Sequence, residues 1–176
     1  LLNWEKIVLD ATTFASPNNT LSTGTDAGYG LFLTNGSLLN AGTTFNLTGN
    51  LDIDSASIFQ GYGAGSGVYA ISGSVTNGGT ITTQDGAAGD VITVGGDYTG
   101  VSGSTYKIDT VLGNDSSTTD NLVVEGNTSG TSTLIVRPAA GSPGAQTIEG
   151  IKVIDVAGTS GATFTLASAV QAGAYE

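Results

Sequence analysis

The sequence predicts an all-β fold in which the chain winds as a solenoid, and two observations carry this prediction. A motif of Ser, aliphatic, any residue, amide and small residue occurs at residues 37–41, 57–61 and 74–78, at offsets of 20 and 17 residues. One such unit cannot bury its apolar face alone, so stacking of successive units is its route to a core. The composition, with 39% hydrophobic residues, 11% charged residues and 28 glycines, is typical of short strands separated by turns.

The N-terminal third alternates short β-prone runs with turn residues. The run at residues 30–34 ends at Asn35 and Gly36, which favour a turn because both tolerate a positive φ. Residues 43–48 and 51–54 alternate polar and apolar side chains, as half-buried strands do. Residues 2–10 leave a helix open as an alternative, but Pro17 follows and no capping box precedes them, so we favour a strand.

From about residue 91 the predicted strands and their connecting loops become longer. We expect strands at residues 91–94, 105–109, 121–125, 131–137, 151–156 and 163–166. The apolar residues at 151, 153, 154 and 156 predict a strand that is covered on both faces. We therefore divide the chain into repeats at 1–90 and better-packed C-terminal repeats at 91–176, continuous with each other. An open solenoid end exposes unpaired backbone, and residues 139–144 have the hairpin chemistry to cap it.

Composition argues against several functions. Four basic residues against fifteen acidic ones give a net charge of −11, which repels a polyphosphate, so we expect no nucleic-acid partner. No apolar run approaches the roughly 20 residues that span a bilayer, so we expect no direct membrane insertion of this segment. The chain has no cysteine and no histidine, which removes thiolate chemistry and the usual general base of a serine hydrolase. We predict no catalytic residues and no cofactor.

Two carboxylates are candidates for a catalytic pair, because parallel β-solenoids also include polysaccharide-active enzymes. Asp52 and Asp54 are two residues apart and would share one face of a strand, a spacing that suits paired acids or a cation. The basic residues that a lyase would use are scattered, at Lys6, Lys107, Arg137 and Lys152. We favour a solvated strand face over an active site.

A metal loop and an aromatic binding patch are two further candidates. Asn114, Asp115 and Asp120 place oxygen ligands close together in the sequence, but the repeats of a calcium-binding β-roll are absent. We favour a turn held by Asx and Ser side chains, and predict no metal site. The aromatic residues Trp4, Tyr29, Tyr62 and Tyr69 could bind a sugar or a receptor, but we favour loop aromatics that partly cover the rod.

A series of stretches in the second half resembles a known family. They are residues 96–100 (GDYTG), 112–124 (LGNDSSTTDNLVV), Gly126, Gly130, 150–156 (GIKVIDV), 164–166 (FTL) and 172–175 (AGAY). In order and spacing they resemble the C-terminal part of autotransporter passenger domains, the type V secretion family, in the region called the autochaperone. The resemblance is specific over about the last eighty residues and generic before them.

The resemblance implies a fold, a location and a partner. It implies a three-sided, right-handed parallel β-helix that is exported through the periplasm and outer membrane to the cell surface or medium, where the C-terminal coils form early and template the rest. The chain would then be a monomeric fragment of a longer protein, and its partner would be its own C-terminal outer-membrane barrel, beyond Glu176.

Two sets of residues are expected to serve this folding role. The apolar ladder positions are Leu122, Val124, Ile151, Val153, Ile154, Phe164 and Leu166, and the turn glycines are Gly96, Gly113, Gly150 and Gly173. Two other functions stay open. One is a host-receptor-binding adhesin or effector module, with loops such as residues 60–69 contacting a host cell-surface protein. The other is the polysaccharide-active enzyme considered above.

Overall fold

The structure, a computed structural model, describes residues 4–16 and 19–172. The described residues form eighteen strands, and they contain no helix that is long and apolar enough to span a membrane. The strands are β1 (Lys6–Asp10), β2 (Thr13–Ala15), β3 (Asn19–Ser22), β4 (Gly30–Thr34), β5 (Leu38–Asn40), β6 (Thr44–Thr48), β7 (Leu51–Ile53), β8 (Ile58–Gln60), β9 (Val68–Ile71), β10 (Val75–Asn77), β11 (Thr80–Thr82), β12 (Val91–Val94), β13 (Tyr98–Gly100), β14 (Thr105–Thr110), β15 (Asn121–Val124), β16 (Thr128–Pro138), β17 (Ile154–Val156) and β18 (Thr163–Leu166).

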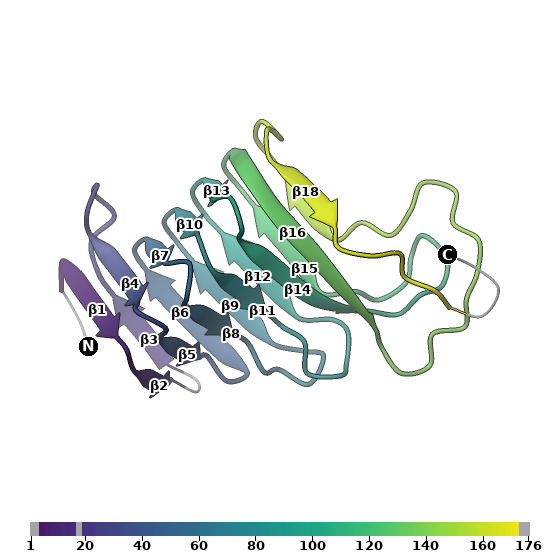
Figure 1. Ribbon diagram of the computed structural model, residues 1–176, viewed down its shortest axis with the longest axis horizontal. Coiled ribbons are helices and arrows are strands. Elements are labelled where there is room, and N and C mark those ends of the chain that lie inside the picture. The colour runs from purple at the N-terminus through teal and green to yellow at the C-terminus, as the bar shows by residue number, and fades with distance from the viewer. Residues whose placement is uncertain (1–3, 17–18, 173–176) are drawn as a thin grey trace.

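The strands form the three faces of a parallel β-helix, and three successive strands make one coil (Figure 1). The first face contains β1, β4, β7, β10 and β13, the second β2, β5, β8, β11 and β14, and the third β3, β6, β9, β12, β15 and β17. The long strand β16 belongs to two faces, because its start pairs with β13 and its end with β14. Every pairing between these strands is parallel, which confirms the predicted fold. We number the coils from 1 (β1–β3) to 6 (β16 and β17).

Two of the three copies of the repeated motif, at residues 37–41 and 57–61, lie on top of each other in neighbouring coils. Leu38 lies opposite Ile58, and the amide of Ser37 donates a 3.1 Å hydrogen bond to Oγ of Ser57. The copy at residues 74–78 is on a different face, because Val75 pairs with Leu51 and Tyr98. The residue opposite Ile58 on the next coil is Thr80. The third copy was therefore a wrong assignment, because an offset of 17 residues is shorter than the coil that separates Ile58 from Thr80.

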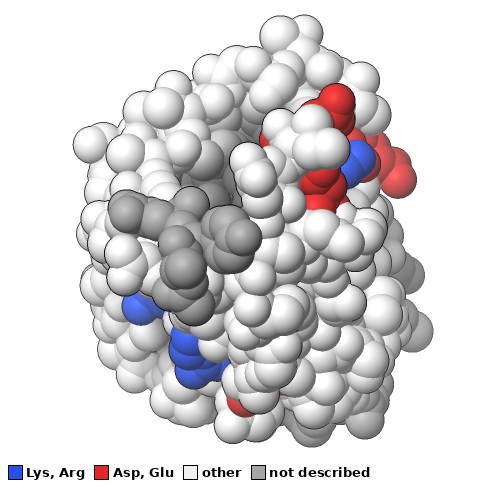
Figure 2. Space-filling view, turned by 90° about the vertical axis from the view of Figure 1, so that its right-hand side faces the viewer, with Lys and Arg blue, Asp and Glu red and all other residues white. Residues whose placement is uncertain are grey.

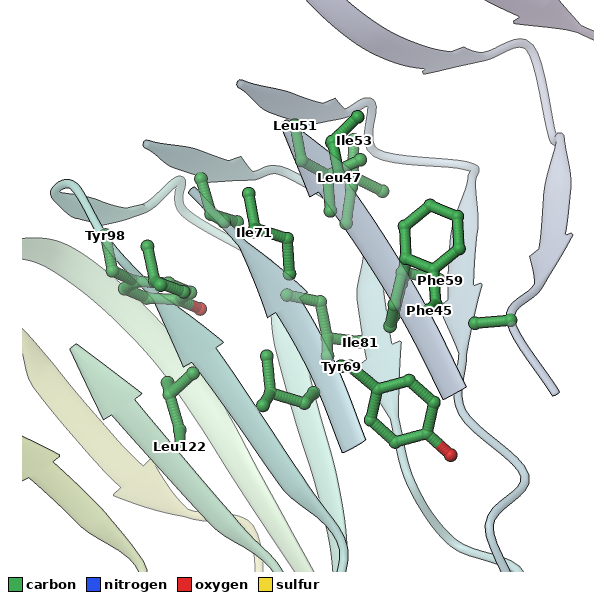
Figure 3. Packing of buried hydrophobic residues seen from close by; sticks show 14 of the residues in the cluster. Phe45, Leu47, Leu51, Ile53, Phe59, Tyr69, Ile71, Ile81, Tyr98 and Leu122 are labelled. Atoms are coloured by element: carbon green, nitrogen blue, oxygen red, sulfur yellow. The ribbon is translucent and has the colours of Figure 1, made fainter. Parts of the chain in front are cut away.

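Alternating side chains fill the interior between the three faces (Figure 3). Phe45, Phe59 and Tyr69 are fully buried and meet edge to face, with ring centroids 5.8 and 6.0 Å apart. The prediction that Tyr69 is a loop aromatic is wrong, because it lies on β9 and its hydroxyl donates to the carbonyl oxygen of Gly42. Trp4, Tyr29 and Tyr62 are exposed.

The expected strand and turn at the N-terminal end are present. Residues 6–10 form β1, not a helix, and Ile7 and Leu9 face the core. Asn35 and Gly36 have φ values of 57° and 81°, as the predicted turn requires. The first and last strands, β1 and β18, lie toward opposite ends of the rod (Figure 1).

Candidate functional site: the C-terminal coils

The predicted ladder residues divide into a buried group and a group at the end of the rod. Leu122 and Val124 on β15 are 1% and 0% exposed and lie between β12 and β17. Ile154 on β17 pairs with Leu122 and is partly buried. Burial on both sides gives Leu122 and Val124 a full set of apolar neighbours in the described core.

The other four ladder residues lie at the last described turn, where none of the described coils covers them. Val153 and Phe164 are partly buried against the core, Ile151 is half-buried, and Leu166 is 46% exposed. The strand expected at residues 151–156 is shorter, since only Ile154–Val156 pairs in a sheet, and Asp155 within it is exposed. Phe164 stacks on Tyr98, with ring centroids 5.6 Å apart.

An apolar cleft of about 330 Å³ opens at this end of the molecule. Its lining is mostly aliphatic and aromatic, and consists of Thr110, Leu112, Gly113, Leu134, Val136, Gly144, Ala145, Thr147, Ile151, Val153, Phe164, Leu166, Val170 and Ala172. Most of the visible surface at this end is neither acidic nor basic (Figure 2). The expected hairpin at residues 139–144 does not form. The strands on either side of it do not pair with each other, because β17 pairs with β15, and the loop between β16 and β17 forms part of the cleft wall.

The predicted turn glycines serve different purposes. Gly150 has a φ of +98°, which favours glycine. A Cβ on Gly96 would lie 2.6 Å from Oγ of Ser74, so this glycine allows close contact with the preceding coil. Gly113 is buried beside the cleft. Gly173 lies outside the described residues.

A carboxylate holds the loop that contains Gly150. Asp115 accepts hydrogen bonds from the amides of Ile148 at 3.0 Å, Glu149 at 3.2 Å and Gly150 at 2.9 Å. The neighbouring Asn114 forms the favoured Asx turn, accepting from the amide and hydroxyl of Ser116. Asp120 is not part of this turn. The described residues contain no group of three or more acidic side chains arranged to hold a metal ion.

Four aspartates gather at the corner where the chain passes from the second face to the third, and we call them the aspartate corner: Asp85, Asp90, Asp109 and Asp120. Asp90, Asp109 and Asp120 are fully buried. Arg137 on β16 forms a bidentate ion pair with Asp109, with Nε–Oδ1 and Nη2–Oδ2 distances of 2.6 Å. Such a charge-assisted pair has the geometry that stabilises a buried carboxylate.

The buried carboxylates differ in how fully they are satisfied. Asp120 accepts from the hydroxyl of Thr83 and from three backbone amides, and burial still raises its pKa. Burial, together with the charges of Asp120 and Asp85, raises the pKa of Asp90 to about 6. Oδ2 of Asp90 is buried and has no hydrogen-bond partner among the described residues. Hydrogen bonds from Arg137 and two amides surround Asp109.

The two aspartates considered for catalysis, Asp52 and Asp54, lie in the N-terminal part of the rod, where Asp54 accepts hydrogen bonds from the backbone. Asp54 accepts from the amides of Asn35 at 2.6 Å and Ala56 at 3.0 Å, and hydrogen bonding lowers its pKa. Partial burial and the charge of Asp54 raise the pKa of Asp52, and Lys6 opposes this. Lys6 also lies over the ring of Phe32, 4.3 Å from its centroid.

Sequence reasoning missed the aspartate corner, because its members are far apart in the chain. Asp90 and Asp120 each stand directly before a strand, and Arg137 is one of four basic residues that are scattered along the sequence. The aspartate that precedes each of two successive strands of the third face is the signal in the sequence that could have indicated that these two side chains stack.

A family model described as Autochaperone Domain Type 1 matches residues 70–176, which include the cleft and the aspartate corner. The chain belongs to this autochaperone family. It is a segment of an autotransporter passenger, the part of such proteins that is secreted or exposed at the cell surface.

Relatives agree with this membership. The chain is 36% identical over 157 residues to the probable autotransporter YfaL of Escherichia coli K12, a match that covers 83% of this chain and 12% of YfaL. It is 48% identical over 90 residues to the autotransporter adhesin AIDA-I of Escherichia coli, covering 51% of this chain and 7% of AIDA-I. The adhesin BmaC autotransporter of Brucella suis is 47% identical over 92 residues, covering 48% and 3%. The chain therefore spans about an eighth or less of these relatives.

Proposed function

We propose that this autochaperone segment is a non-enzymatic folding nucleus. Its C-terminal coils form first, present an ordered edge to the coils that precede them, and thereby assist translocation of the passenger through its own outer-membrane barrel. In a solenoid each coil contacts only its neighbours, so the first coils carry the cost of nucleation and later coils add to an existing edge.

One observation supports this proposal above the others: the three fully buried carboxylates of the described residues all lie within residues 70–176. Buried polar groups that find their hydrogen-bond partners favour one arrangement of the chain over its alternatives. Asp109 and Asp120 bind atoms from residues well separated in sequence, such as Arg137 and Thr83. Coils 4 to 6 therefore have contacts that specify their register in addition to the backbone ladder.

A pair of matched substitutions tests nucleation. Leu122 on β15 and Leu47 on β6 both lie on the third face, point inward and are 1% and 2% exposed. Leu122→Ala and Leu47→Ala should each destabilise the chain by about 2–5 kcal/mol. If the C-terminal coils are the nucleus, L122A slows refolding from denaturant by about 30-fold or more, whereas L47A mainly speeds unfolding.

The same variants can be compared in the full-length passenger, with the protease-resistant form at the cell surface as the readout. L122A should reduce this form more than L47A does. Equal refolding rates and equal surface display for two equally destabilised variants would contradict the nucleation role.

An adhesive role is a second candidate, supported by the names of AIDA-I and BmaC. Exposed Tyr62, in the loop between β8 and β9, would belong to a binding surface for a host cell-surface protein. Binding of the isolated chain to host cells, compared with a variant in which residues 61–66 are replaced, tests it. Equal binding by both would argue against a role for this loop.

A further inference from the structure

The aspartate corner has a consistent direction. In coils 4 and 5, each of its four carboxylates accepts a backbone amide of the preceding coil, on the N-terminal side. The acceptor residues and the amides that they bind form two series, which run side by side at the corner between the second and third faces.

The first series begins with Arg137 in coil 6, which holds Asp109 of coil 5. Oδ2 of Asp109 accepts from the amides of Asp85 at 2.9 Å and Gly86 at 2.7 Å, both in the corner loop of coil 4. The carboxylate of Asp85 in turn accepts from the amide of Ala64 in coil 3. Ala64 has a φ of 51°, which is unfavourable for alanine. The hydrogen bond from its amide to Asp85 therefore stabilises a strained backbone conformation.

The second series begins with Asp120 of coil 5. Its Oδ1 accepts from the amides of Gly89 at 2.9 Å and Asp90 at 3.0 Å in coil 4. Oδ1 of Asp90 accepts from the amide of Gly67 in coil 3, at 2.6 Å. Within coil 5 the two series are joined, because the amide of Asp109 donates to Oδ2 of Asp120 at 2.8 Å.

Several polar side chains at another corner point in the opposite direction. Between the third and first faces, Asn50 accepts from the amide of Ser74, Asp97 from that of Asn127, and Asn127 from that of Thr159, each on the following coil. Asp115 likewise binds a later loop. Backward-pointing links also occur at the corner between the first and second faces, where Oγ of Ser57 accepts from the amide of Ser37 and Oγ of Ser37 accepts from that of Thr12. The aspartate corner differs because its acceptors are carboxylates, three of them fully buried, and hydrogen bonds to charged acceptors are the stronger ones.

We propose that the aspartate corner is a pair of relays through which each C-terminal coil orders the corner loop of the coil before it. Asp85 and Asp90 in coil 4 have their own amides fixed by carboxylates of coil 5 and offer their own carboxylates to coil 3. The proposal rests on the proposed folding function and identifies the residues that pass order from coil 6 toward coil 3.

Hydrogen exchange of single amides in the folded chain tests the direction. Asp109→Asn should raise the exchange rates at positions 85 and 86 at least tenfold, and that at position 64 with them, because the loop that carries the Asp85 carboxylate is released. Asp85→Ala should raise the rate at position 64 by a similar factor and leave position 86 within about twofold of the wild-type rate, because Asp109 still holds that amide. Asp155→Asn, an exposed aspartate paired with Lys152, is the control and should change none of them.

Two outcomes would overturn the relay: D85A releases position 86 as strongly as position 64, or D109N leaves position 64 protected. Asp85 is half-buried, so D85A is expected to fold and tests the direction even where D109N does not fold. These rates are measured in the folded protein and do not depend on refolding. A failure of L122A to slow refolding would therefore contradict nucleation and leave the relay standing, and the reverse holds as well.

Discussion

Asp90 should make this protein less stable as the pH rises through the weakly acidic range. Its carboxylate is fully buried directly before β12, and one oxygen has no partner among the described residues. Burial raises its pKa to about 6, against 3.8 for an unperturbed aspartate. A folded-state pKa above the unfolded one means that the folded chain binds the proton more tightly, so the stabilisation is complete below the unfolded value and is lost as the pH rises to about 6.

The size of this effect follows from the pKa difference. A shift of about two pKa units corresponds to about 3 kcal/mol of unfolding free energy. Asp90→Asn keeps the shape and an oxygen acceptor for Gly67, and removes the charge. The variant should therefore match the wild type near pH 4 and exceed its stability by at most about 3 kcal/mol at pH 8.

Urea unfolding of both proteins at a series of pH values from about 4 to 8 measures the difference directly. The burial-raised pKa of Asp120 produces a slope of the same sign in both proteins, so the informative quantity is the gap between the two curves. The difference in unfolding free energy between the two proteins should widen as the pH rises. A constant difference, or a variant less stable than the wild type at pH 8, would refute the conclusion that the buried charge of Asp90 destabilises the fold.

Two further predictions concern the C-terminal coils. Asp115→Ala should release the amides of residues 148–150 and increase cleavage there by a broad-specificity protease about tenfold, since Ile148 is 94% exposed; an unchanged cleavage pattern would mean that the loop is held by other contacts. Tyr106→Phe should stabilise the chain by about 1 kcal/mol in urea unfolding, because the buried hydroxyl has no partner among the described residues; a loss of stability would reveal a hydrogen bond to that group.

Local patterns in the sequence were sufficient for much of the fold. Alternating residues at 43–48 and 51–54 produced β6 and β7, and the residues at 35 and 36 formed the expected turn. These features depend on the pleat of a single strand and the φ preferences of single residues, so they can be read over a few neighbouring positions. The family resemblance near the C-terminus was likewise carried by contiguous stretches.

The aspartate corner and the end of the rod could not be read in this way. Thr83 and Asp120 are 37 residues apart, and Arg137 and Asp109 are 28 apart, so only the winding of intervening loops brings them together. Leu166 and Ile151 look like core residues by pattern, but they lie where no described coil covers them.

The sequence by itself determined that this chain forms short strands, turns at Gly and Asn, and coils that stack in parallel. Tertiary structure alone decided which residue lies opposite which on the next coil, as the displaced motif at residues 74–78 shows. The physical reason is that the side-chain alternation of a strand is set locally, whereas register between coils depends on loop lengths that vary from coil to coil. Burial of Asp90, Asp109 and Asp120 follows from that register.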